Sequence, residues 1–446
     1  MKNTLTLVMI FFAAIFTANG QSEKIKFVEY DLSNGLHVIL HADDRTPNVM
    51  VSLMYHVGAK NEDPSRTGFA HFFEHLMFEG SDHIGRGEYF KMIQAAGGSL
   101  NANTSQDRTF YFENMPSNQL ELALWMEAER MLHAKIDTIG VNTQKGVVIE
   151  ERKQSYDNRP YGTFMEELGK RAFTVHPYQW QTIGDPEHIR AATFDDIKNF
   201  YDTYYVPNNC VLVIAGDFEE KQTRQWVDKY FGSIPRGTLP MYRPEIVEPM
   251  PTQEIKDVVY DNIQLPALFM AYHAPEMGTR EAYAMDILTQ ILSGGASSRL
   301  KTNLEDKGLT LQSQAFNFQC EDPGLLYVLA IPNMGTPLAD VEAALTTEVE
   351  RMSKELVSEE EFQMAMAAKE FEVAANLQSL AGKAQALCDA YTYFKDAERV
   401  NKELATFQSI TREDIQNVAR KYLQTNTRVV LHYVPMAEKN ESNTND

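Results

Sequence analysis

The chain has 446 residues and carries a formal net charge of -21 at pH 7. This acidic excess excludes nucleic acid as a partner, because no surplus of Lys and Arg is present to neutralise phosphates. Three cysteines provide no disulfide framework, and the length exceeds what one hydrophobic core usually supports, so two domains are expected.

Residues 1–20 have the order of a cleaved secretory signal peptide. Lys2 precedes an apolar stretch from Leu5 to Thr17, and the small residues Ala18-Asn19-Gly20 follow it. The stretch is too short for a comfortable membrane span, and no later window reaches the roughly twenty apolar residues that a span requires. We therefore expect a periplasmic or secreted protein without a membrane span.

The rest of the chain alternates short β-rich runs with long helical patterns. Residues 36–41 and 49–56 have the pattern of strands, and residues 119–132 and 341–354 have helical periodicity. This mixture predicts an α+β fold in which antiparallel-rich β-sheets pack against α-helices.

Prolines divide the chain nearly in half. Five of them lie between Ile234 and Thr252, a density that blocks both helix and strand pairing. We therefore predict a first domain over residues 22–234, a linker over 235–252 and a second domain over 253–436. The polar residues 437–446 are expected to form a disordered tail.

The two halves contain an internal repeat. Residues 193–204 and the apolar run 211–214 recur as residues 411–422 and 429–432, at an offset of 218. Residues 53–56 similarly recur as residues 270–273, at an offset of 217. The sequence therefore predicts two homologous domains with one fold.

The strongest chemical signal is the HxxEH pattern His71-Phe-Phe-Glu74-His75. On a helix this spacing places both imidazoles on one face, where they can bind a single ion. An apolar stripe at helical spacing predicts such a helix independently; its members are Phe69, Phe72, Phe73 and Leu76.

A zinc hydrolase needs an open metal position and a nearby carboxylate that takes a proton from water. Glu74 is the candidate base, because it projects from the same helical face as the histidines. The alternative is an accidental polar face on a surface helix. An aromatic-backed helix that carries two of only eleven histidines favours the metal.

At these motifs the sequence resembles the pitrilysin and insulinase family (M16) of inverted-motif zinc peptidases. The short bacterial members and the mitochondrial processing peptidase β-subunit are especially similar. The resemblance covers the whole mature chain; its other motifs are Phe78-Glu-Gly80, Gly97-Gly-Ser-Leu-Asn-Ala102, Val147-Val-Ile-Glu-Glu151, Arg159-Pro-Tyr-Gly162 and Tyr205-Val-Pro-Asn-Asn209.

The resemblance implies a third metal ligand in a VVxxE helix, which is Glu151 in this chain. Glu150 is the adjacent competitor, but a helix turns it about 100° away. One Zn²⁺ per chain, held by His71, His75 and Glu151, is therefore implied. Gln144 stands where the family often has a further glutamate, and as an outer residue it can still form hydrogen bonds.

The family's edge strand, which pairs with extended substrate, corresponds to residues 97–111. The resemblance thus implies substrate contacts at Asn101, Ala102 and Asn103, because strand addition suits peptides of varied sequence. From the spacing alone, a structural hairpin with asparagines is the alternative.

The second half carries no metal site, because the repeat places Leu288, Ile291 and Leu292 at the positions of His71, Glu74 and His75. Active members of the family also use an Arg and a Tyr that follow an SSRL-like segment. This chain has Ser297-Ser-Arg-Leu300, but Glu305 and Leu311 stand where that pair is expected. The resemblance implies that a homologous metal-free subunit supplies the pair in a heterodimer, with a homodimer as the alternative.

The sequence thus predicts a zinc endopeptidase subunit that hydrolyses unfolded or extended peptides in an enclosed chamber. Water activated by Zn²⁺ would be the nucleophile and Glu74 the general base. The rival is a structural or peptide-binding subunit that does not cut. The complete set of HxxEH residues and Glu151 favours the enzyme, because packing alone requires none of them.

Overall fold

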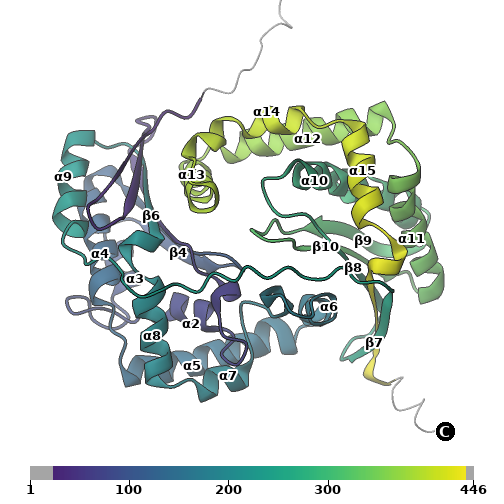
Figure 1. The fold of residues 1–446 in the computed structure, drawn as a ribbon, viewed down its shortest axis with the longest axis horizontal. Helices are drawn as coiled ribbons and strands as arrows, with labels where there is room; N and C mark the ends of the chain where they lie inside the picture. Colours follow the sequence, from purple (N-terminus) through teal and green to yellow (C-terminus); the bar gives the residue numbers. More distant parts are fainter. Residues whose placement is uncertain (1–23, 438–446) are drawn as a thin grey trace, which may run out of the picture.

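The structure, a computed structural model, describes residues 24–437 and consists of two halves, each built on one β-sheet (Figure 1). The predicted signal peptide and the tail beyond residue 437 lie outside the described residues. Within residues 24–437, no helix is long and apolar enough to cross a lipid bilayer.

The first sheet has six strands in the order β1-β2-β6-β3-β5-β4. Their bounds are β1 Val28–Asp31, β2 His37–Ala42, β3 Asn48–Tyr55, β4 Ser99–Thr104, β5 Thr109–Pro116 and β6 Cys210–Gly216. Only β2 and β6 run parallel, and the other neighbours are antiparallel. Strand β4 therefore forms one edge of this sheet.

The second sheet repeats this arrangement with five strands in the order β7-β11-β8-β10-β9. Their bounds are β7 Ile255–Asp261, β8 Ala267–His273, β9 Thr310–Asn317, β10 Leu325–Pro332 and β11 Val429–Pro435. Again one pair, β7 and β11, is parallel. Without β1, the strand order and directions match those of the first sheet, so both are mixed sheets with mostly antiparallel pairs.

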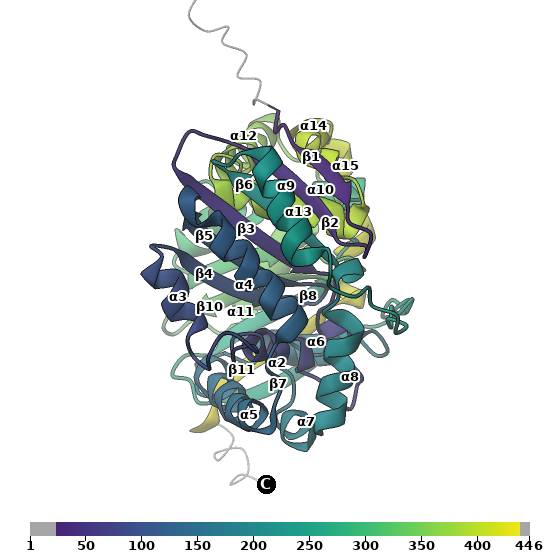
Figure 2. The same cartoon turned by 90° about the vertical axis from the view of Figure 1, so that its left-hand side faces the viewer.

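Helices cover both sheets. Those of the first half are α2 Phe69–Leu76, α3 Tyr89–Ala95, α4 Leu120–His133, α5 Thr138–Arg152, α6 Phe164–Ala172, α7 Pro186–Ala191, α8 Phe194–Tyr204 and α9 Glu220–Phe231. Those of the second half are α10 Arg280–Ser293, α11 Leu338–Lys354, α12 Glu359–Asn376, α13 Leu380–Phe394, α14 Glu403–Gln408 and α15 Arg412–Tyr422. Figure 2 shows α4 and α9 lying on the outer face of the first sheet.

The predicted repeat has a clear structural counterpart in α8 and α15. Thr193 caps α8 and Thr411 caps α15, each in a reciprocal capping box with the aspartate three residues on. The same local signal therefore starts the equivalent helix in each half. The strands that follow, β6 and β11, occupy equivalent central positions in the two sheets.

The two halves exchange one helix each. Helix α13 of the second half packs on the inner face of the first sheet, where Leu387 and Cys388 join the apolar side chains of β3 and β6. Helix α6 of the first half packs in the same way on β8 and β11 of the second sheet. The two helices begin 216 residues apart, close to the repeat offset, so they are equivalent elements. Each core is completed by the other half.

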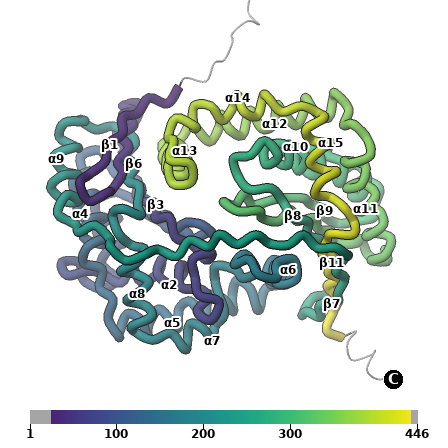
Figure 3. Tube along the Cα trace, in the orientation of Figure 1, coloured from purple at the N-terminus to yellow at the C-terminus, as the bar shows by residue number. Residues whose placement is uncertain are grey.

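The proline-rich segment contains no helix or strand between the end of α9 at Phe231 and the start of β7 at Ile255 (Figure 3). It is nevertheless held to the first half. The Glu248 carboxylate accepts the N–H groups of Val175 and His176 at 3.0 and 2.8 Å. The segment therefore connects the halves along a defined path.

Candidate metal centre

Helix α2 presents the HxxEH residues on one face and its apolar stripe on the other, as predicted. Phe72, Phe73 and Leu76 are fully buried in the first core. His71 and His75 keep 12% and 23% of their side-chain surface exposed, so both can reach a ligand.

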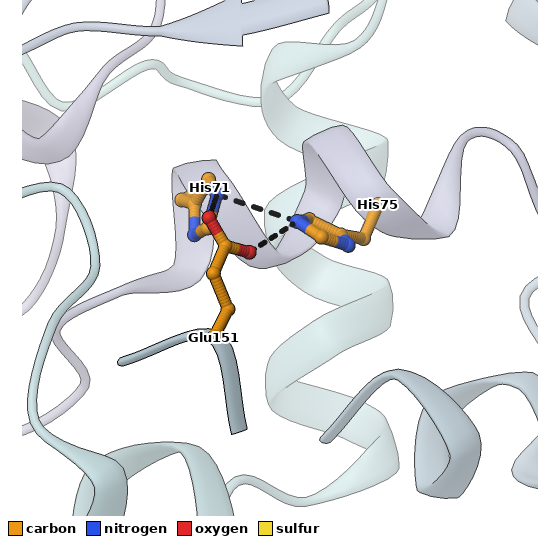
Figure 4. A group of neighbouring side chains, drawn as sticks. All are labelled: His71, His75 and Glu151. Atoms are coloured by element: carbon orange, nitrogen blue, oxygen red, sulfur yellow. Dashed lines mark hydrogen bonds and ion pairs between the residues drawn. The ribbon is translucent and has the colours of Figure 1, made fainter. Parts of the chain in front are cut away.

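Helix α5 brings Glu151 to this face. The Asp137 side chain caps the helix by accepting the N–H of Gly140 at 2.8 Å. Glu151 lies in the last turn before a π-helical turn at Lys153–Asp157, and its carboxylate points at the histidines (Figure 4). The neighbouring Glu150 is exposed and pairs with Lys153 at 3.3 Å instead.

The three side chains converge at distances that suit one ion. The Nε2 atoms of His71 and His75 are 3.3 Å apart. Glu151 oxygens lie 3.7 Å from His71 Nε2 and 3.2 Å from His75 Nε2. Tetrahedral zinc ligands at about 2.0–2.1 Å from the metal lie about 3.3 Å from one another, so the donor set fits Zn²⁺. Within residues 24–437, these three residues are the one group of at least three His, Cys, Asp or Glu side chains that lie close enough together to hold a metal ion.

The pKa shifts of His71 and Glu151 also favour the protonation states that metal ligands need. Burial, and then the neighbouring His75, lower the pKa of His71 to about 4, so its imidazole is neutral at physiological pH. The hydrogen bond with His75 lowers the pKa of Glu151, which favours the carboxylate. A neutral imidazole and an ionised carboxylate are the states that bind a metal.

Glu74 does not join this triad of ligand atoms but lies beside it. Its Oε2 accepts the hydroxyl of Thr104 at 2.6 Å, and burial raises its pKa from the ordinary value. A carboxyl group with a raised pKa is suited to accept a proton near neutral pH. No pattern in the sequence points to Thr104, which lies thirty residues from Glu74 at the end of β4.

Replacing Thr104 by Val removes this hydrogen bond while preserving the shape of the side chain. We expect kcat/KM for peptide hydrolysis to fall about 10- to 100-fold, because a hydrogen bond to a charged group contributes roughly 1.5–3 kcal/mol. Zinc content should not change, since Thr104 contacts none of the three ligands. Steady-state kinetics with parallel metal quantitation checks this. Equal kinetics for the wild type and Thr104→Val would show that the hydrogen bond from Thr104 to Glu74 does not assist catalysis.

Gln144 lies on α5, where its Nε2 donates to Oε1 of Glu79 at 2.5 Å. Glu79 is itself paired with Arg86, which also contacts Asp137 at 2.9 Å. Gln144 therefore belongs to a network that joins the end of α2 to the start of α5.

The expected substrate strand is β4, which pairs only with β5 in the first sheet. Asn101 and Asn103 are exposed, and Ala102 is half-buried. The N–H of Ala102 donates to Asn101 Oδ1 at 2.9 Å, a bond outside the ladder with β5. The strand thus offers a free edge that ends at Thr104, next to Glu74.

The second half places apolar side chains at the positions equivalent to His71, Glu74 and His75. Leu288, Ile291 and Leu292 are buried in α10. Glu305, at one of the two positions where the resemblance led us to expect the Arg/Tyr pair, accepts the N–H of Ser313 at 2.7 Å and so has a local structural partner. Leu311, at the other position, is 54% exposed.

A cavity of about 870 Å³ lies between the halves. Its lining includes Thr104, Arg108 and Tyr178 from the first half and Tyr283, Asp389 and Glu403 from the second. Because Thr104 also contacts Glu74, the cavity begins beside the candidate base.

Two protein-family models match successive parts of the chain. Residues 37–185 match the insulinase family, peptidase family M16, and residues 191–369 match the peptidase M16 inactive domain. The chain therefore belongs to the M16 family of peptidases, and the resemblance inferred from its motifs is confirmed. The segment matched to the inactive domain is the one in which Leu288, Ile291 and Leu292 stand at the positions of His71, Glu74 and His75.

The chain is similar in sequence to other proteins over most of its length. The zinc protease PqqE of Helicobacter pylori is 28% identical over 411 residues, which cover 91% of this chain and 92% of that protein. A probable mitochondrial-processing peptidase subunit β of Arabidopsis thaliana is 23% identical over 335 residues, covering 72% of this chain and 62% of that protein.

Solved structures confirm the predicted fold class. The crystal structure of a protease from Helicobacter pylori has a TM-score of 0.88 and 27% identity, and the match covers 92% of this chain and 100% of that chain. The chain thus has the two-domain M16 fold, with mixed sheets packed against helices.

Proposed function

We propose that this chain is a zinc-dependent endopeptidase subunit that hydrolyses unfolded or extended peptides. The convergence of His71, His75 and Glu151 at distances suited to one Zn²⁺, with Glu74 alongside, carries the proposal. The names of relatives such as the zinc protease PqqE support it.

In this proposal each residue has one role. His71 and His75 would hold Zn²⁺ through Nε2, and Glu151 would hold it through a carboxylate oxygen. When bound, Zn²⁺ lowers the pKa of water towards neutrality and polarises a carbonyl group. Glu74 accepts the proton of the attacking water on its carboxylate and delivers it to the leaving nitrogen, while Thr104 orients that carboxylate.

The peptide pairs with the free edge of β4, where Asn101, Ala102 and Asn103 lie. Main-chain hydrogen bonds along an edge strand carry affinity without requiring a particular sequence. Asn101 Oδ1 must release the N–H of Ala102 when the peptide binds there. One end of the peptide then enters the cavity beyond Thr104. This cavity acts as part of an enclosed chamber.

We also propose that a homologous metal-free M16 subunit completes the site in a heterodimer. Glu305 and Leu311 occupy the positions of the family's Arg/Tyr pair, so this chain does not supply that pair to itself. A homodimer remains the alternative. The signal-like residues 1–20 support a periplasmic or secreted location.

The assignment of the third ligand is tested by neutralising each glutamate of the adjacent pair. We expect Glu151→Gln to weaken zinc binding at least tenfold, since an amide is a poor ligand compared with a carboxylate. Glu150→Gln is the matched control, because Glu150 is exposed and pairs with Lys153, and its zinc affinity should equal that of the wild type.

The measurement is competition for zinc against a chromophoric chelator, combined with hydrolysis of a quenched unstructured peptide. A weaker affinity for Glu150→Gln than for Glu151→Gln would overturn the assignment. A wild-type chain that neither binds zinc nor cuts with any partner would support the rival structural subunit.

A further inference from the structure

A buried carboxylate lies at the start of the helix that carries both histidines. Glu62 is only 1% exposed and follows the short helical turn η1 (Ala59–Asn61). Its Oε2 accepts the N–H of Gly68 and its Oε1 accepts the N–H of Ala70, both at 2.8 Å. Glu62 therefore caps α2 from outside the helix.

Helix α2 has no side-chain cap of its own. Its N-cap residue is Gly68, with a φ of 92°, and a side chain there would come within 2.8 Å of the Ile183 oxygen. The first N–H groups of a helix have no partner within it, so a buried start needs an external acceptor. Glu62 supplies that acceptor through both of its carboxyl oxygens.

The position of this cap matters because α2 has only eight residues and His71 follows Ala70 directly. A short helix whose first turn is loosened can shift or fray, and either change would move the imidazole of His71 relative to His75. Metal sites tolerate displacements of only about 0.5 Å. Burial raises the pKa of Glu62 to about 8, and the two N–H donors oppose that rise.

We propose that Glu62 is a positioning residue of the metal site, which fixes the first turn of α2 and thereby the geometry of His71 and His75. The inference rests on the proposed function, since it concerns the zinc that these histidines would bind. Glu62 is not one of the proposed metal ligands or substrate contacts, so its effect reaches the site through the backbone of α2.

Glu62→Gln tests the proposal, because glutamine keeps the shape but presents an amide group to one of the two N–H donors. We expect the Kd for zinc, measured against a chromophoric chelator, to rise about 10- to 100-fold, as for outer groups that orient metal ligands. The Ala70 amide should also exchange its hydrogen faster in the metal-free protein, a readout independent of activity.

Ser358→Ala is the matched control. Ser358 caps α12 by accepting the N–H of Glu361 at 3.1 Å, so the variant also loses a helix cap, but in the other half. Its zinc Kd should equal that of the wild type. If Glu62→Gln fails to fold, Glu62→Asp keeps the carboxyl group with a shorter reach and should also raise the zinc Kd above that of the wild type.

The outcomes separate the two proposals. Wild-type zinc binding with an unchanged Kd in the Glu62 variants would overturn the role of Glu62 and leave the zinc site intact. A wild-type chain without measurable zinc affinity would overturn the proposed function and this inference with it. An equal rise in Kd for Ser358→Ala would show a general loss of stability and would also overturn the inference.

Discussion

Replacing Glu74 by Gln is expected to abolish most peptide hydrolysis while leaving zinc bound. The amide has nearly the shape of the carboxylate but cannot accept a proton from water. Since general base catalysis contributes roughly 10²- to 10⁴-fold, we expect kcat to fall by a factor in that range. His71, His75 and Glu151 are untouched, so the zinc content should remain near one per chain.

The measurement is turnover of a quenched unstructured peptide by the zinc-loaded protein, with metal quantitation on the same sample. His71→Ala is the comparison, because it should lose activity together with zinc. A Glu74→Gln protein that retains both zinc and full turnover would show that another group takes the proton.

Separating the halves within the linker is expected to unfold both of them. Without α13, the first sheet exposes a whole face of apolar side chains; these include Ile39, Met50, Met54, Phe110, Val211 and Val213. At about 1.5–3 kcal/mol for each large side chain, their exposure costs on the order of 10 kcal/mol. That is comparable with the entire free energy of unfolding of a typical domain.

Residues 22–234 and 235–436 should therefore be insoluble or lack a cooperative thermal transition when each is produced alone. Produced together, they should associate and recover the transition, because α6 and α13 can dock across the break. Circular dichroism melting and size-exclusion chromatography report both results. A cooperatively folded, monomeric first half would contradict the role of α13.

Much of the candidate site could be predicted from the sequence. The stripe of Phe69, Phe72 and Phe73 fixed which face of α2 is buried, and so placed His71 and His75 on the accessible face. Periodicity is informative here because it depends only on neighbours within one helix. The likeness of the two halves was also visible, since capping boxes are local signals.

Contacts between distant segments could not be predicted in this way. An apolar face indicates that a helix is buried but not which sheet it covers, so the exchange of α6 and α13 has no signature in either helix. Thr104 and Glu62 are likewise single polar residues without a spacing partner. Their roles depend on how β4 and the turn before α2 approach the metal helix, which only the fold determines.

The proposed peptidase activity depends on zinc held by His71, His75 and Glu151. We would remove metal with a chelator, add Zn²⁺ stepwise, and follow hydrolysis of an unstructured peptide with and without a metal-free M16 homologue. We expect activity to rise linearly and to stop rising at one zinc per chain, and we expect Glu151→Gln to remove this breakpoint. Activity that is independent of zinc would contradict the proposal.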